Sequence, residues 1–120
     1  MATADDVRRI ALSLPEVTEK PSYGGRPGWR VKAKLFLTIR TEAEGGMVAF
    51  VADLDEKEAL LASDPRKFFT TPHYDGYPIV LVHLAEVGTD ELTELIVDSW
   101  LVCAPPRVLA VHSEAVQRLV

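Results

Sequence analysis

The stretch WRVKAKLFLTIR, from Trp29 to Arg40, decides the fold because a regular alternation of side chains begins there, after a loop rich in Gly and Pro. Successive side chains of an extended chain point to opposite sides, so a period of two indicates a half-buried strand. Leu35, Leu37 and Ile39 are expected on one face of this strand, and Phe36 on the other.

The strand pattern extends to both sides of this stretch. Trp29 to Val31 pairs with the next strand through a tight turn at Lys32-Ala33-Lys34. Glu44-Gly45-Gly46 is typical of a hairpin turn and leads into a third strand, Met47 to Val51. These three segments predict an antiparallel arrangement.

Two more strands are predicted in the second half of the chain, at Phe68 to Thr71 and at Tyr77 to Leu84. The loop between them contains Asp75-Gly76, residues that tolerate the positive φ of tight turns. Ile79 to Val82 is a continuous apolar run, which predicts a central strand that is buried on both faces.

Helical periodicity appears in four segments, and Thr3 with Asp6 forms a capping box before the first of them. They are Val7 to Leu14, Glu56 to Ala62, Leu92 to Cys103 and Val108 to Val120. The sequence leaves open whether the last segment is one helix or two.

These elements predict a single domain over residues 1–120, in the order α-β-β-β-α-β-β-α. Short hairpin connections favour an antiparallel sheet of about five strands, with the helices packed on it as a second layer. The expected fold class is therefore α+β. A length of 120 residues suits one domain of this kind.

Four stretches spread over most of the chain form a further pattern. They are Leu12 to Pro15, Pro21 to Val31, Phe68 to Pro78 and Leu92 to Trp100. Together they resemble the MmcQ/YjbR family of small bacterial proteins. The resemblance implies an α+β fold similar to that of CyaY/frataxin-like and secretion-chaperone-like proteins. It also implies DNA binding through wing-like hairpins.

The composition is that of an ordinary globular protein, with 48% hydrophobic and 26% charged residues. It excludes a disordered or fibrous chain. Met1 to Asp6 lacks the pattern of a secretory signal, and no window approaches the ~20 apolar residues of a membrane span. Cys103 is the only cysteine, which agrees with a reducing compartment. We therefore expect a cytoplasmic protein without a membrane partner.

The segment from Lys20 to Thr41 is strongly basic. It contains six Lys and Arg residues and no Asp or Glu, so it carries +6 and leaves −11 of the net charge of −5 to the rest of the chain. Tyr23, Trp29 and Phe36 are interleaved with these cations. Basic residues and aromatic rings on a short hairpin are typical of a surface that binds a polyanion.

We therefore predict weak nucleic-acid binding by this hairpin, helped by Tyr74 and two basic residues further along the chain. The candidate residues are Tyr23, Arg26, Trp29, Arg30, Lys32, Lys34, Arg66 and Lys67. Arg and Lys neutralise phosphates, while Tyr23 and Trp29 offer stacking faces. The alternative for Trp29 is that it belongs partly to the core, because an aromatic ring at the start of a strand packs first and binds second. The alternative is a solvated hairpin whose cations pair with acidic residues of the same protein.

A second functional hypothesis is a protein- or small-ligand-binding module that uses the concave, aromatic side of the sheet and no nucleic acid. His73, Tyr74 and Tyr77 are candidates to line a pocket together with the loop Tyr23 to Trp29. The alternative for His73 to Tyr77 is a simple turn, in which Asp75 bonds its own backbone.

No catalytic residue, metal site or cofactor is predicted. The sequence holds no P-loop, nucleophile elbow or dinucleotide-binding pattern, and its His residues lack metal-ligand spacing. Cys103 lies on the apolar stripe of the longest predicted helix, where burial raises the pKa of a thiol. The acidic residues of that helix, Asp90, Glu91, Glu94 and Asp98, are interpreted as its solvated side.

Overall fold

The computed structural model describes residues 1–40 and 46–120. Its α-helices are α1 (Ala4–Ser13), α2 (Leu54–Ser63), α3 (Thr89–Cys103) and α4 (Pro106–Gln117). Its strands are β1 (Val17–Pro21), β2 (Pro27–Val31), β3 (Lys34–Ile39), β4 (Gly46–Phe50), β5 (Phe68–Phe69) and β6 (Ile79–His83). Within the described ranges the 3-10 turns are η1 (Tyr23–Gly25), η3 (Pro72–Tyr74) and η4 (Leu84–Glu86).

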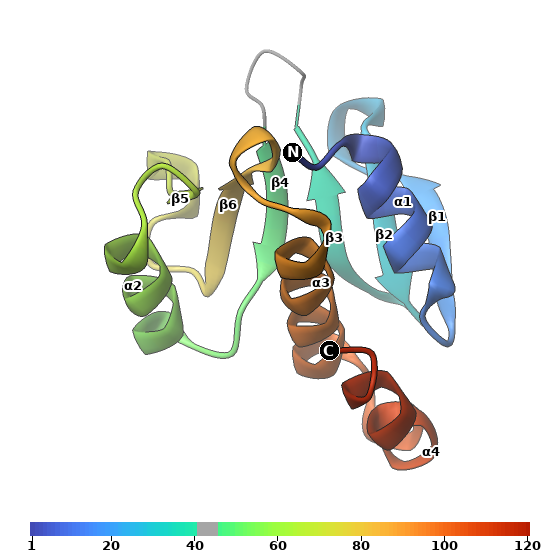
Figure 1. Ribbon diagram of the computed structural model, residues 1–120. Helices are drawn as coiled ribbons and strands as arrows, with labels where there is room; N and C mark the ends of the chain where they lie inside the picture. Colours follow the sequence, from blue (N-terminus) through green and yellow to red (C-terminus); the bar gives the residue numbers. More distant parts are fainter. Residues whose placement is uncertain (41–45) are drawn as a thin grey trace.

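The strands form one antiparallel sheet in the order β1-β2-β3-β4-β6-β5 (Figure 1). β1 and β5 are its edges, and β6 lies inside it. The predicted α+β class with an antiparallel sheet is confirmed. The sheet has six strands rather than about five because the sequence did not predict β1.

β1 was missed because its side chains show no alternation of burial. Val17 is half-buried, and every residue from Thr18 to Pro21 is exposed. An edge strand of this kind is held by main-chain pairing with one neighbour, here β2. Its side-chain pattern therefore carries no signal of a strand.

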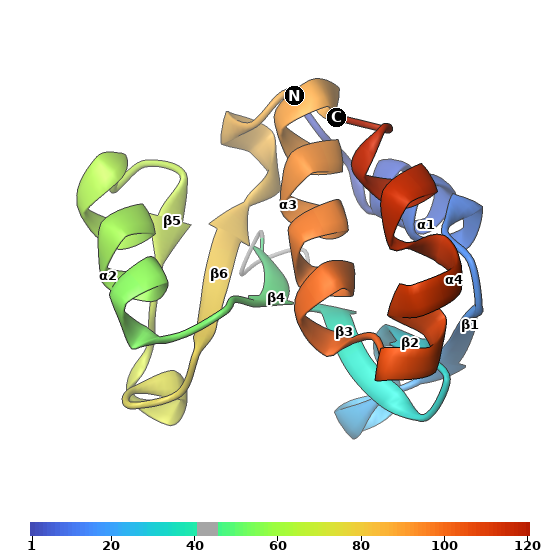
Figure 2. The ribbon, with the colours of Figure 1, turned by 90° about the horizontal axis from the view of Figure 1, so that it is seen from below.

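The helices cover one face of the sheet. α1 lies over β1 and β2, α3 lies over β3 and β4, and α4 packs against α3 (Figures 1 and 2). α2 packs beside β5 and β6 at the edge of the sheet. In the described part of the chain, the other face carries no α-helix, and the turns η1 and η3 border it (Figure 2).

The main core lies between the helices and the sheet and contains both tryptophans. Trp29 of β2 and Trp100 of α3 are fully buried. Nε1 of Trp100 donates to the Pro15 carbonyl oxygen at 3.1 Å, and Nε1 of Trp29 donates to Oε1 of Glu19 at 3.1 Å. A buried indole whose N–H is paired adds a large apolar area without an unsatisfied donor. The first bond joins α3 to the segment between α1 and β1, and the second joins β2 to β1.

A β-bulge in β3 changes which side chains face the helices. Trp29 pairs with Leu37 and Arg30 pairs with Leu35, so Phe36 is an extra residue between the two pairs. Phe36 and Leu37 are both fully buried. The strict alternation predicted for this strand is therefore wrong at the bulge.

β6 is buried on both faces, as its apolar run predicts. Val80 and Val82 belong to the main core, while Leu81 between them is fully buried on the opposite side. Val48 of β4 is the cross-strand partner of Leu81 and is buried with it. The helix-free face therefore has a small apolar centre of its own.

The remaining local predictions have mixed outcomes. The capping box of Thr3 and Asp6 is present, and Gly76 has the positive φ expected of its turn, 79°. The C-terminal segment is one helix, α4. Residues 44 and 45 of the predicted hairpin turn lie outside the described residues. No described helix is long and apolar enough to span a bilayer.

Candidate anion-binding face

The cross-strand register places basic residues of β1 and β2 on the face without helices. Trp29 and Val31 point into the main core, so Arg30 between them points to the other side. Lys20 is the partner of Gly28, which lies on the same side of β2 as Arg30. Lys20 and Arg30 therefore share the helix-free face.

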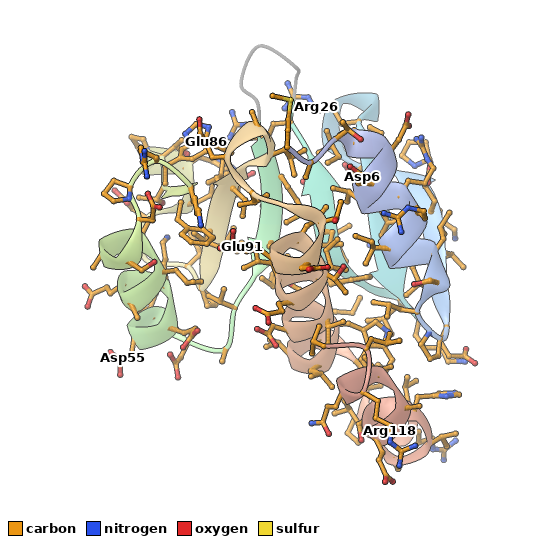
Figure 3. The ribbon with its side chains drawn as sticks, in the orientation of Figure 1. Asp6, Arg26, Asp55, Glu86, Glu91 and Arg118 are labelled. Carbon is orange, nitrogen blue, oxygen red and sulfur yellow. The ribbon has the colours of Figure 1, made fainter. Side chains whose placement is uncertain are left out.

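The loop between β1 and β2 holds Arg26 over the same face. The N–H and the hydroxyl of Ser22 both donate to the Arg26 carbonyl oxygen, at 2.6 and 3.0 Å. Gly28 is required beneath this loop because a Cβ there would lie 2.9 Å from Cβ of Ser22. Gly24 and Gly25 supply the positive φ angles of the loop. Figure 3 shows Arg26 at the end of the molecule that also carries Asp6.

Arg26 and Arg40 line a hollow of about 170 Å³ in the helix-free face, here named the Arg26–Arg40 hollow. Its floor is apolar and consists of Leu35, Ile39, Val48, Phe50 and Ile79. The guanidinium carbon of Arg40 lies 5.9 Å from the centroid of the Tyr74 ring, within the range of a cation–π contact. Two guanidinium groups, a phenol ring and an apolar floor suit an anion that has a flat or apolar body.

Aromatic rings continue from this hollow towards the β5 edge. Nζ of Lys34 lies 5.0 Å from the centroid of the Phe50 ring, but Lys34 is the cross-strand partner of the core residue Val31 and does not line the hollow, so this predicted residue points to the helix-covered side. The rings of Phe69 and His83 stack with their centroids 4.1 Å apart. The register places Phe69 beside Leu81, on the same helix-free side. The face thus combines cations with aromatic rings, of which Tyr74 and Phe50 lie beside the cations and Phe69 and His83 lie nearer the β5 edge.

Acidic side chains are missing from this face in the strands that the structure describes. Glu19 is the only acid in those strands, and it accepts hydrogen bonds from Trp29 Nε1 and Arg8 Nε, at 3.1 and 2.9 Å. The bond from Arg8 is the main reason why the pKa of Glu19 is below its usual value. We call the set of Lys20, Arg26, Arg30 and Arg40 the cationic face.

Three of the predicted binding residues form ion pairs outside the hollow. Nζ of Lys32, in the turn between β2 and β3, lies 2.8 Å from the Glu16 carboxylate. Nζ of Lys67 lies 3.0 Å from the carboxylate of Glu91, which Figure 3 shows on α3. Arg66 lies 3.7 Å from an aspartate two residues earlier. Lys32 and Lys67 therefore fit the alternative in which cations pair with acids of the same protein.

Trp29 offers no stacking face, because its ring is fully buried in the main core. The prediction that Trp29 contacts nucleic acid is therefore wrong: the first large ring of a strand packs against the helices instead. The side chain of Tyr23 lies outside the described residues. Tyr74 and Phe50 are the rings that the structure places beside the cations.

The loop after β5 is attached to α2 by a buried lysine. Lys57 is 5% exposed, and its Nζ donates to the carbonyl oxygens of Tyr74 at 2.6 Å and Tyr77 at 3.0 Å. Tyr74 lines the hollow together with Ser22 and Arg26 of the earlier loop, and its role as a pocket residue stays a prediction. His73 and Tyr77 do not line it. Sequence analysis missed Lys57 because a lysine on a short helix is normally exposed.

The His, Cys, Asp and Glu side chains of the described residues bear on metal binding and on thiol chemistry. They include no group of three or more His, Cys, Asp or Glu side chains that would hold a metal ion. Cys103 is buried on α3, and burial raises the pKa of its thiol, as the sequence predicts. A thiol in this setting packs as a small apolar side chain.

Comparison with known proteins identifies the family. Residues 12–102 match the family model described as YjbR. The uncharacterized proteins Rv2570 of Mycobacterium tuberculosis and Mb2600 of Mycobacterium bovis are each 40% identical over 125 residues, which cover 91% of this chain and 94% of theirs. The crystal structure of Deinococcus radiodurans protein DR2400 shares the fold, with a TM-score of 0.70 and 23% identity over 84% of this chain and 78% of that chain. This chain belongs to the YjbR family, as its four sequence stretches predict.

Proposed function

We propose that this protein binds single-stranded nucleic acid through its cationic face. The segregation of charge carries the proposal: four cations share a face on which the described strands present no acid. Such a face attracts a polyanion even though the whole chain has a net charge of −5. Counterions released from the phosphates supply most of the affinity in contacts of this type.

The aromatic rings beside the cations favour a single strand over a duplex. Tyr74 and Phe50 border the Arg26–Arg40 hollow, which has an apolar floor. Unpaired bases expose faces that stack on such rings, with a contribution of about 1–3 kcal/mol per base. The bases of a duplex are already stacked on one another and do not reach into a hollow of a sheet.

The proposed surface differs from the hairpin predicted from the sequence. Arg26 and Arg30 belong to both, whereas Lys32 points to an acid near α1 and Trp29 points into the core. Arg40, which lies outside the predicted binding set, joins Arg26 in the hollow. The proposed contacts therefore run along the sheet face and not around the turn.

A matched pair of charge removals within one hairpin tests the proposal. Arg30→Gln removes a cation from the cationic face, and Lys32→Gln removes one from the adjacent turn. Fluorescence anisotropy with a labelled oligonucleotide of about 12 nucleotides, at about 50 and 200 mM salt, measures each affinity. We expect Arg30→Gln to weaken binding roughly three- to tenfold and to flatten the salt slope by about 0.7. Lys32→Gln should change the affinity by less than about twofold.

Two outcomes contradict the proposal, provided that circular dichroism shows both variants to be folded. The first is an absence of binding by the unaltered protein at low salt. The second is equal weakening by the two variants, because that result would reflect net charge and not the cationic face.

A small anionic ligand is the second candidate function, and the hollow itself favours it. Arg26, Arg40 and Tyr74 around an apolar floor suit one phosphate or carboxylate on a compact body. Competition with a mononucleotide distinguishes the two functions. Displacement by the mononucleotide near the Kd of the oligonucleotide, with no effect of Arg30→Gln, would identify a small ligand.

A further inference from the structure

A second cavity, of about 290 Å³, lies between α2 and α3 on the helix-covered side of the sheet. Ala49 of β4 and Val80 of β6 contribute its floor, and Leu60 of α2 and Leu95 of α3 contribute its walls. Figure 2 shows α2 and α3 standing apart over this part of the sheet. Glu56, Asp98 and Val102 of its lining are exposed, so the cavity opens to solvent and a small ligand can enter it.

The polar groups of this cavity are mainly two carboxylates. The hydroxyl of Ser99, which also lines the cavity, is satisfied because it donates to the Phe50 carbonyl oxygen at 2.6 Å. Glu56 of α2 and Asp98 of α3 supply the negative charges of the lining. The cavity therefore has apolar walls that suit an apolar group and two carboxylates, of Glu56 and Asp98, that suit a cation.

The surroundings of Asp98 favour a positive occupant. Burial raises the pKa of Asp98, and the negative charges of Glu94 and Glu56 raise it further. A cation at this place would relieve the repulsion among the three carboxylates, whereas an anion would increase it. A neutral ligand would gain only the apolar contacts.

We propose that the cavity binds a small organic amine, with its apolar body between Leu60 and Leu95 and its ammonium group beside Glu56 and Asp98. The volume lies near the lower end of the range of about 300–1,000 Å³ for small-molecule sites. This size matches an amine that has one ring or a short apolar chain. The site is separate from the cationic face, which lies on the opposite side of the sheet.

Three probes of similar shape test the charge requirement: 2-phenylethylamine, the neutral 2-phenylethanol and the anion phenylacetate. Two-dimensional NMR of the ¹⁵N-labelled full chain follows the amide signals of α2 and α3 during titration. We expect the amine to shift these signals with a Kd of about 1 mM. The alcohol should bind at least roughly threefold more weakly, and the anion should not bind.

Two substitutions on the same helix provide the matched control. Asp98→Asn should weaken amine binding roughly three- to tenfold and leave the alcohol unaffected, because it removes a charge from the cavity and keeps the shape. Asp90→Asn removes an equal charge from α3 outside the cavity lining and should change the affinity by less than about twofold. Unchanged amide signals in β1 and β2 show that both variants are folded.

Three results overturn the proposal. One is the absence of shifts in α2 and α3 with the amine, and another is equal binding of the amine and the alcohol. The third is an amine affinity that Asp98→Asn does not lower, or lowers no more than Asp90→Asn does.

Discussion

The two faces of the sheet contain different kinds of residue. The helix-covered face carries both tryptophans and packs against the main core. The helix-free face carries the four cations of the cationic face and a small apolar centre formed by Val48 and Leu81. Because successive strand residues alternate between faces, one strand serves both. β2 places Trp29 in the core and Arg30, its neighbour, on the surface. Stability and binding should therefore respond to different substitutions, even between adjacent residues.

The strongest test of this division is Trp100→Ala on the helix-covered side. Trp100 is fully buried, and its indole N–H donates to Pro15. The substitution leaves a cavity under α3, so we expect the free energy of unfolding to fall by about 3–5 kcal/mol. Urea denaturation followed by circular dichroism measures the change. A loss below about 1 kcal/mol would show that the main core does not lie where we describe it.

Lys57→Ala should have the next largest effect, because Lys57 joins α2 to the loop that borders the helix-free face. The substitution leaves two carbonyl oxygens, of Tyr74 and Tyr77, without their buried donor. We expect a loss of about 1–3 kcal/mol in unfolding free energy and faster hydrogen exchange in the loop. The exposed neighbour is the control, since Glu58→Ala should change stability by no more than about 0.5 kcal/mol. Equal effects of the two variants would contradict an anchoring role for Lys57.

The free energy of unfolding should depend on pH through Asp98 of α3, whose ionised form is disfavoured in the folded state. Its pKa is raised in the folded state by burial first, so between the usual Asp pKa and the raised one the folded state binds more protons than the unfolded state. Stability from this group is therefore lost as the pH rises through that interval. Asp98→Asn should remove this dependence and should leave stability at neutral pH unchanged or higher by up to about 1 kcal/mol.

Glu19 should show the opposite sign, since its pKa is lowered in the folded state, chiefly by the hydrogen bond from Arg8. The contribution of Glu19 to the free energy of unfolding is fully present above the usual Glu pKa. It is lost as the pH falls through the lowered pKa of the folded state. Urea denaturation at a series of pH values from about 3 to 7 measures the free energy of unfolding of the wild type, Asp98→Asn and Glu19→Gln. The comparison separates the pH-dependent contribution of Asp98 from that of Glu19. A curve for Asp98→Asn that parallels that of the wild type would contradict the assignment to Asp98.

The smallest effect on stability is expected for Arg30→Gln. Arg30 is half-buried on the helix-free face, and its Nη1 donates a weak hydrogen bond to the Ala33 carbonyl oxygen at 3.5 Å. Unfolding free energy should change by no more than about 0.5 kcal/mol, although nucleic-acid affinity falls. A large loss of stability would show that the cationic face also holds the fold together.

Features that depend on neighbours in the sequence were predicted well. The capping box of Thr3 and Asp6, the turn at Gly76 and the buried strand at Ile79 to Val82 all need only local chemistry or a local run of apolar residues. β1 had no such signal, because its side chains are exposed and its main chain is held by β2. An edge strand of this kind is defined by its main-chain pairing with the neighbouring strand, which the sequence of the edge strand alone does not contain.

The structure brings some of the predicted site residues together and separates others. Arg26 and Arg30 lie on the cationic face, and Tyr74 lines the hollow. That these residues bind a ligand stays a prediction. Trp29 and Lys32 were assigned to the same surface because they are close in sequence. The structure separates them, since a strand and its turn point neighbouring side chains in different directions.

Local composition and periodicity were sufficient to establish a basic segment from Lys20 to Thr41 and the α+β class, and the resemblance of four sequence stretches indicated the family. Only the tertiary structure decided that Arg26, Arg30 and Arg40 share one face while Trp29 and Lys32 leave it. The physical reason is that the side to which a strand residue points depends on its register with neighbouring strands. The bulge at Phe36 changes that register by one residue, and no period read along the chain contains this information.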